Sequence, residues 1–142
     1  MTYSPLITET MPPVRQEYGD KWSPRPPGGL VDGLIVHHHA TTNDSGIARL
    51  VTSADKASAN YIIRTSGAMI GSVPEEFRAW TSGSPAADNT KITVEVQDET
   101  GAPEWRISDA AMATLAKLYA DVASRHGFPP DRAHITGHRD WA

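Results

Sequence analysis

A short apolar run that ends in three histidines decides the fold class of this chain. Residues 33–41 read GLIVHHHAT. An aliphatic run of this length, placed between a glycine-containing turn and a polar segment, predicts a buried β-strand. Side chains alternate along a strand, so we expect His37 and His39 on one face of the sheet and His38 on the other.

The elements predicted around this strand alternate between strands and helices. Residues 60–65 and 68–73 are rich in β-branched residues and flank Ser66-Gly67, which predicts a hairpin. Residues 92–97 alternate between apolar and polar side chains and predict another strand, and residues 134–139 predict a short one. Apolar spacing predicts a short helix over 46–53, capped by Asp44 or Ser45, and a longer one that begins at Ser108 and ends before Gly127. Together they predict an α/β fold in which a single mixed β-sheet is flanked by helices.

The first 29 residues have a different character. They contain six prolines and end in Gly28-Gly29. Proline fixes φ and lacks a backbone donor, so this density excludes a regular helix or a central strand. We therefore expect residues 1–29 to form a Pro-rich N-terminal arm that wraps a domain spanning residues 30–142.

Composition excludes several classes of function. The chain of 142 residues fits one domain, and its net charge of −4 without a basic run argues against nucleic acid as a partner. It has no cysteine, so a disulfide framework, a thiol nucleophile and a Cys-type zinc site are excluded. No segment resembles a signal peptide or reaches the roughly 18 apolar residues of a membrane span, so we expect cytoplasmic synthesis and no membrane insertion.

The residues suited to chemistry are histidines and one carboxylate. His37 with His39, or either alone, could bind a metal, although adjacent histidines are also typical of a polar strand end. Glu95 lies inside the strand predicted over 92–97, where it either faces solvent or lies in a cleft that raises its pKa toward that of a general base. His126 suits a helix C-terminus and His134 a buried position, whereas we expect the following carboxylates to be solvated: Asp98, Glu99 and Glu104.

Five segments in order resemble a known family. They are residues 34–41 (LIVHHHAT), 58–63 (SANYII), 78–80 (RAW), Asn89 with 92–95 (ITVE), and 136–140 (TGHRD). They are similar to the zinc-dependent N-acetylmuramoyl-L-alanine amidases, whose fold is shared by phage endolysins and peptidoglycan recognition proteins. The resemblance covers about residues 30–142 and is greatest to the amidase domain of an endolysin from a phage of actinobacteria.

The resemblance implies a function and a set of site residues. It implies hydrolysis of the amide bond between N-acetylmuramic acid and L-alanine by a zinc-activated water, with peptidoglycan as the partner of a monomeric protein that acts on the cell wall after release. His37 and His138 match the first two Zn²⁺ ligands and Glu95 matches the general base. Ala59 stands where some members place a catalytic tyrosine, which favours Glu95 further. The residues expected to bind substrate are Trp80, Asn60, Thr81 and Asn89.

One departure from the family pattern leaves alternatives open. Similar proteins supply a third ligand, Cys or Asp, at a position that would fall beyond Ala142. We therefore expect either a chain truncated at its C-terminal end or a metal site completed by a local residue, for which His39 is the candidate. Two other functions follow from the same departure: a catalytically impaired peptidoglycan-binding module, and a zinc hydrolase that uses His37, His39 and His138 together.

Overall fold

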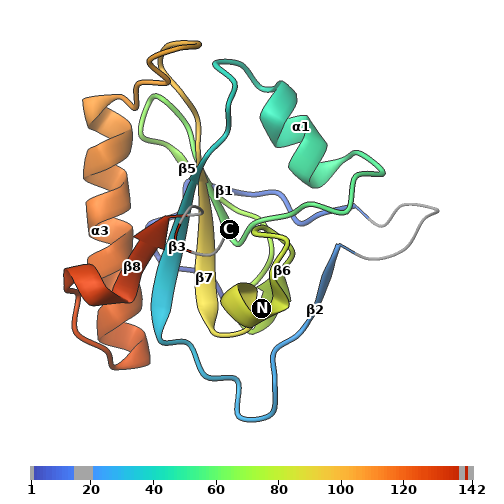
Figure 1. Cartoon of the computed structure of the whole chain (residues 1–142), viewed down its shortest axis with the longest axis vertical. Coiled ribbons are helices and arrows are strands. Elements are labelled where there is room, and N and C mark those ends of the chain that lie inside the picture. Colours follow the sequence, from blue (N-terminus) through green and yellow to red (C-terminus); the bar gives the residue numbers. More distant parts are fainter. Residues whose placement is uncertain (1, 15–20, 138–139, 141–142) are drawn as a thin grey trace.

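The computed structural model describes residues 2–14, 21–137 and 140. Within this part of the chain, the centre of the molecule is a six-stranded sheet with the order β1-β5-β4-β7-β3-β8 (Figure 1). Its strands are β1 (Glu9–Thr10), β5 (Met69–Gly71), β4 (Tyr61–Ile63), β7 (Lys91–Val96), β3 (Gly33–His38) and β8 (Ile135–Gly137). Within the described part of this six-stranded sheet, only the β4–β5 pair is antiparallel, so the predicted mixed sheet is confirmed.

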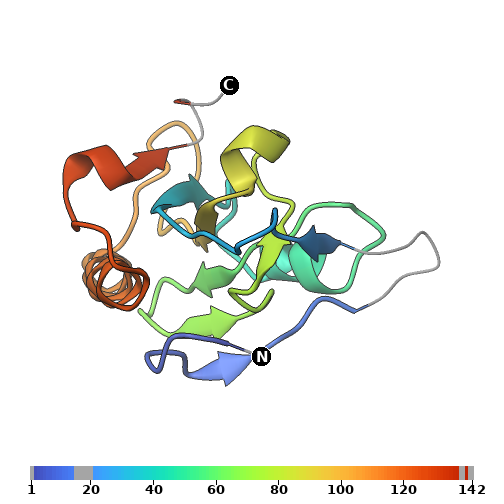
Figure 2. The same ribbon diagram turned by 90° about the horizontal axis from the view of Figure 1, so that it is seen from below.

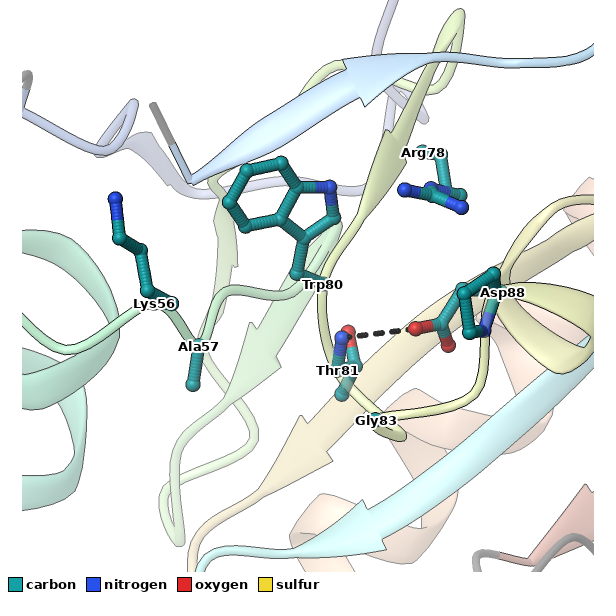
Figure 3. Close-up of a pocket in the computed structure, with 8 residues that line it drawn as sticks. Lys56, Ala57, Arg78, Trp80, Thr81, Gly83 and Asp88 are labelled. Atoms are coloured by element: carbon teal, nitrogen blue, oxygen red, sulfur yellow. Dashed lines mark hydrogen bonds between the residues drawn. The ribbon is translucent and has the colours of Figure 1, made fainter. Parts of the chain in front are cut away.

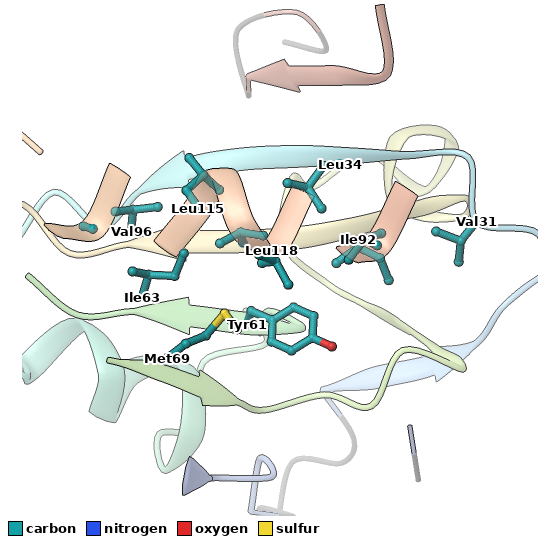
Figure 4. Packing of buried hydrophobic residues seen from close by; sticks show 12 residues of the cluster. Val31, Leu34, Tyr61, Ile63, Met69, Ile92, Val96, Leu115 and Leu118 are labelled. Atoms are coloured by element: carbon teal, nitrogen blue, oxygen red, sulfur yellow. The ribbon is translucent and has the colours of Figure 1, made fainter. Parts of the chain in front are cut away.

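One face of the sheet packs against the long helix α3 (Asp109–His126). The strand residues on this face alternate along each strand with those on the opposite face. They form one apolar cluster, to which α3 contributes Leu115, Leu118 and Val122 (Figure 4). The predicted ends of this helix are confirmed: the Ser108 side chain accepts a hydrogen bond from the Ala111 amide, and Gly127 ends the helix with a φ of 78°.

The opposite face is covered by two short helices. Helix α1 (Ser45–Val51) packs Ile47, Leu50 and Val51 against a second apolar cluster that includes Ile62 and Ile70. Helix α2 (Pro85–Asp88) lies on the same side, away from α3 (Figure 2). Sheet and helices therefore form layers, with α3 on one side of the central strands and α1 and α2 on the other. Asp44 precedes α1 as predicted, but its side chain makes no cap hydrogen bond.

The N-terminal arm follows the edge of the structure rather than its centre. Its first part adds β1 in parallel to β5, and the Tyr3 hydroxyl donates to the Ser72 carbonyl. Its second part forms β2 (Trp22–Pro24), which pairs with β6 (Phe77–Ala79) in a separate two-stranded sheet. Sequence patterning did not predict β2, β6, α2 or the 3₁₀ turn η1 (Arg132–His134). In the described ranges, no helix is long and apolar enough to span a membrane.

Candidate functional site

His37 and Glu95 lie side by side on two adjacent central strands, β3 and β7. They are partners in the parallel register of β3 and β7, on the face away from α3. Both are buried, with 7% and 5% of their surface exposed. Glu95 is therefore buried, so the predicted alternative in which it faces solvent is wrong. Burial raises the pKa of Glu95 to about 8, Arg49 opposes this rise and Asp98 adds to it. Glu95 can thus exchange a proton near neutral pH.

His39 lies beside this pair but deeper in the protein. Its Nε2 atom is 3.9 Å from the Oε2 atom of Glu95, and its side chain is fully buried. Burial, with Arg49 and His38 nearby, lowers the pKa of His39 to about 4, so its imidazole is neutral. Gly46 of α1 lies against the ring, since a Cβ there would come within 3.2 Å of it. His39 shares the face of Glu95, as its strand alternation predicts.

His38 points to the other face and binds a different carboxylate. Its Nδ1 atom lies 3.2 Å from Asp98, and its ring is 5.6 Å from that of Trp105. Asp98 is fully buried and also accepts a hydrogen bond from the Thr41 amide. The expectation that Asp98 is solvated is therefore wrong, because its carboxylate ties the end of β7 to the end of β3.

The other two histidines have structural partners. His126 Nε2 is 2.7 Å from Glu75 at the end of α3. His134 is partly exposed rather than buried, with Asp131 at its Nδ1 and Phe128 stacked on its ring. Neither histidine approaches Glu95, so both are set apart from the candidate site.

The fit of a metal to this site can be tested on its polar atoms. Glu95 Oε2 and both ring nitrogens of His39 are buried without a hydrogen-bond partner. Buried polar atoms in proteins are normally paired, so this corner of the sheet is built to receive a further polar group. Among the described residues no three metal-binding side chains converge. His138, the predicted second ligand, lies outside the described residues, and His37 is the one predicted ligand that the structure places.

A pocket of about 410 Å³ opens on the same face of the sheet. Its lining includes Trp80 and two cationic side chains, Lys56 and Arg78, which lie on either side of the indole (Figure 3). Asp88 shapes the turn beneath them by accepting hydrogen bonds from the amides of Thr81 and Ser82. An aromatic face flanked by two cations suits a ligand that carries both apolar surface and negative charge.

The pocket connects to Glu95 through a pair of hydroxyls. Thr81 Oγ1 is 2.7 Å from Thr93 Oγ1, and Thr93 precedes Glu95 by two residues on the same face of β7. The structure therefore brings two of the predicted substrate-binding residues, Trp80 and Thr81, to one pocket, and Thr81 contacts the strand that carries Glu95.

The remaining predicted substrate-binding residues are placed differently. Asn60 is fully buried, and its amide donates to the Val73 carbonyl while its oxygen accepts from the Thr93 amide. The structure does not bring Asn60 to the pocket. Asn89 contributes indirectly, because its Oδ1 accepts a hydrogen bond from Arg78. Lys56 was missed, since a single lysine in a polar loop carries no sequence signal for a site.

Comparison with known proteins identifies the family and supports the fold. A family model described as N-acetylmuramoyl-L-alanine amidase matches residues 25–142. No curated protein sequence matches the chain. Among solved structures, a selenomethionine derivative of AmpD superposes with a TM-score of 0.73 at 20% identity, covering 97% of this chain and 84% of that one.

Two further solved structures carry informative descriptions. The endolysin LysCS from Clostridium intestinale has a TM-score of 0.66 and 15% identity, covering 99% of this chain and 85% of its own. AmiD from E. coli, described in complex with its substrate anhydro-N-acetylmuramic acid-L-Ala-D-γ-Glu-L-Lys, has a TM-score of 0.65 and 20% identity, covering 82% and 52%. At these identities the similarities establish the fold.

Proposed function

Because this chain belongs to the N-acetylmuramoyl-L-alanine amidase family, we propose that it hydrolyses the amide bond between N-acetylmuramic acid and L-alanine in peptidoglycan. The observation that carries the proposal is the buried Glu95, next to His37 on the adjacent strand and on the same strand as Thr93, which the pocket residue Thr81 contacts. A carboxyl with a pKa near 8 is matched to accepting and returning a proton at neutral pH.

Glu95 has two tasks in this reaction. It first takes a proton from the attacking water as the new C–O bond forms at the scissile carbonyl. It then donates that proton to the nitrogen of L-alanine as the C–N bond breaks, which leaves a carboxylate on the lactyl group and a free amino terminus. No acyl-enzyme forms, and the chain contains no cysteine that could serve as nucleophile.

The family also implies a Zn²⁺ ion, which we assign to His37 and His138. When bound, Zn²⁺ lowers the pKa of a water molecule and polarises a carbonyl. His37 suits this task because it lies in register with Glu95, at the place where the Glu95 Oε2 atom lacks a partner. Its location there would keep the metal and the base on the same face of the sheet.

The pocket supplies the recognition of substrate in this proposal. The Trp80 indole offers an apolar face to a sugar ring or peptide, while Lys56 and Arg78 complement the carboxylates of a stem peptide. The substrate named for AmiD has this combination of sugar, peptide and carboxylates. We further propose that the chain acts as a monomeric amidase domain of an endolysin from an actinobacterial phage, on the cell wall.

The experiment that tests the proposal measures new L-alanine amino termini released from purified peptidoglycan, with added Zn²⁺ and with a chelator. Wild type should release them in a chelator-sensitive manner. Glu95→Gln should reduce the rate by about 10²–10⁴-fold while leaving the amount of bound zinc unchanged. Glu104→Gln is the matched control, because Glu104 is exposed in a loop, and it should keep the wild-type rate.

Two results would contradict parts of this assignment. Release at the wild-type rate by Glu95→Gln would remove Glu95 as the base. Muropeptide binding that survives the chelator, without any release by wild type, would instead favour the peptidoglycan-binding module.

A further inference from the structure

One face of the N-terminal arm runs along the pocket. Strand β2 pairs antiparallel with β6, and Ser23 stands directly opposite Arg78 in that pairing. Side chains of alternate residues share a face of an extended chain, so Lys21, Ser23 and Arg25 point to the same side. Ser23 and Arg25 contact residues that line the pocket, whereas Lys21 contacts the end of α1.

Ser23 contacts the two side chains that define the pocket. Its Oγ atom accepts one hydrogen bond from Trp80 Nε1 and another from Arg78 Nε, both at 3.0 Å. The indole N–H is the only polar group of a tryptophan, so this bond determines how the ring is rotated. The second bond determines where the Arg78 guanidinium lies, and the side-chain Oδ1 atom of Asn89 accepts a hydrogen bond from its Nη1 atom.

Lys21 and Arg25 hold the helices that flank Ser23. The buried Lys21 ammonium donates to the carbonyls of Arg49 and Ser53 at the end of α1. Arg25, also buried, donates to the carbonyls of Asp88 and Asn89 at the end of α2. Cations at these positions satisfy carbonyl groups that a helix leaves unpaired. The arm thereby sets the two helices on either side of the pocket, with Ser23 between them.

We propose that Ser23 is a positioning residue of the pocket, and that its hydroxyl holds Trp80 and Arg78 in the orientation that receives an anionic peptidoglycan fragment. The identity of the fragment rests on the proposed function, whereas the orientation of the two side chains does not. Ser23 precedes residue 25, where the match to the family model begins.

The test combines a spectroscopic signal with a binding measurement. The indole N–H resonance of Trp80 is identified by its loss in Trp80→Phe, and the affinity for N-acetylmuramoyl-L-Ala-D-γ-Glu-L-Lys is measured by titration. In Ser23→Ala we expect the resonance to shift and its proton to exchange faster with solvent, with Kd rising about 2–10-fold, the equivalent of one lost hydrogen bond. Ser23→Thr keeps the hydroxyl and should restore both properties.

A matched control removes another hydroxyl from the same arm. Thr8 donates to the Met69 carbonyl beside the opposite end of the sheet, so Thr8→Val should change neither the Trp80 signal nor Kd. An unchanged indole resonance and Kd in Ser23→Ala would overturn the role of Ser23, and so would equal changes in Thr8→Val. A wild-type chain that binds no muropeptide would instead overturn the proposed function, so the two failures are distinguishable.

Discussion

The Nε2 atom of His39 lies 3.9 Å from the Oε2 atom of Glu95, and neither atom has a hydrogen-bond partner among the described residues. The separation is too long for a hydrogen bond, so packing rather than a bond to His39 places the carboxylate. The pair therefore poses a specific question: whether His39 is a ligand of the proposed Zn²⁺ ion or only packs beside Glu95.

Replacement of His39 answers this question. If His37 and His138 are the ligands, His39→Leu should bind Zn²⁺ in the same molar ratio as wild type, because leucine fills a similar volume without offering a donor. His37→Ala should lose the metal. Metal content after dialysis, measured by elemental analysis, separates these cases. Loss of zinc in His39→Leu would support the three-histidine hydrolase instead.

Gly46 should resist substitution although it lies in a helix. Alanine favours a helix over glycine by about 1 kcal/mol, but a Cβ at position 46 would lie 2.6 Å from Thr41 Cγ2 and 3.2 Å from the His39 ring. We expect Gly46→Ala to lower the free energy of unfolding by about 1–3 kcal/mol, as overpacked cores do. Urea denaturation measures this change.

A second variant identifies the cause of that loss. Thr41→Ser removes the Cγ2 atom but keeps the hydroxyl, so the double variant should recover part of the stability lost in Gly46→Ala. Gly101→Ala is the control, because no atom lies within 4 Å of a Cβ at that position. Wild-type stability in Gly46→Ala would contradict the prediction, because α1 would then shift away from Thr41 and His39 without lowering the free energy of unfolding.

The buried Glu75 should make stability depend on pH in the acid range. Burial raises the pKa of Glu75, but hydrogen bonds from His126, Arg125 and Tyr61 outweigh it and hold the pKa at about 2, below its ordinary value of 4.5. A carboxyl with a lowered pKa stabilises the folded state above its unfolded pKa, and this contribution is lost as the pH falls toward 2.

Comparison with Glu75→Gln isolates this contribution. Above pH 5, wild type should exceed the variant in free energy of unfolding by about 3 kcal/mol, and the difference should vanish as the pH falls from about 5 to about 2. Urea denaturation at several pH values measures it, with the exposed Glu104→Gln as control. A difference that stays constant with pH would mean that the charge of Glu75 does not stabilise the fold.

Sequence patterning predicted the parts of the fold that depend on local regularity. Strand β3 was predicted from its continuous apolar run, and strand β7 and helix α3 were predicted because apolar residues recur there with the period of a strand or a helix. These patterns placed His37 and Glu95 on strands. What it could not show is that these strands are neighbours in register, because that depends on pairing between residues far apart in the chain.

The missed features depend on distant partners. Lys21 and Arg25 look like exposed charges in a Pro-rich segment. Both are buried, however, and donate hydrogen bonds to backbone carbonyls at least 28 residues away in the sequence. Asp98 follows a strand in a polar loop, which favours exposure, but its carboxylate is taken up by Thr41 and His38. Asn60 belongs to a motif that the family resemblance associates with substrate binding. Its side-chain amide is instead hydrogen-bonded to backbone groups of the core.

The register of His37 with Glu95 has a consequence for how such a protein can diversify. Adjacent strands lie about 4.8 Å apart, and their backbone hydrogen bonds set the spacing of these two side chains. The pocket walls, by contrast, come from the segment after α1, from β6 and the loop that follows it, and from α2. Under the proposed function, mutation in those outer segments can change which wall fragment is admitted without changing the spacing of His37 and Glu95, so substrate range and chemistry are free to evolve separately.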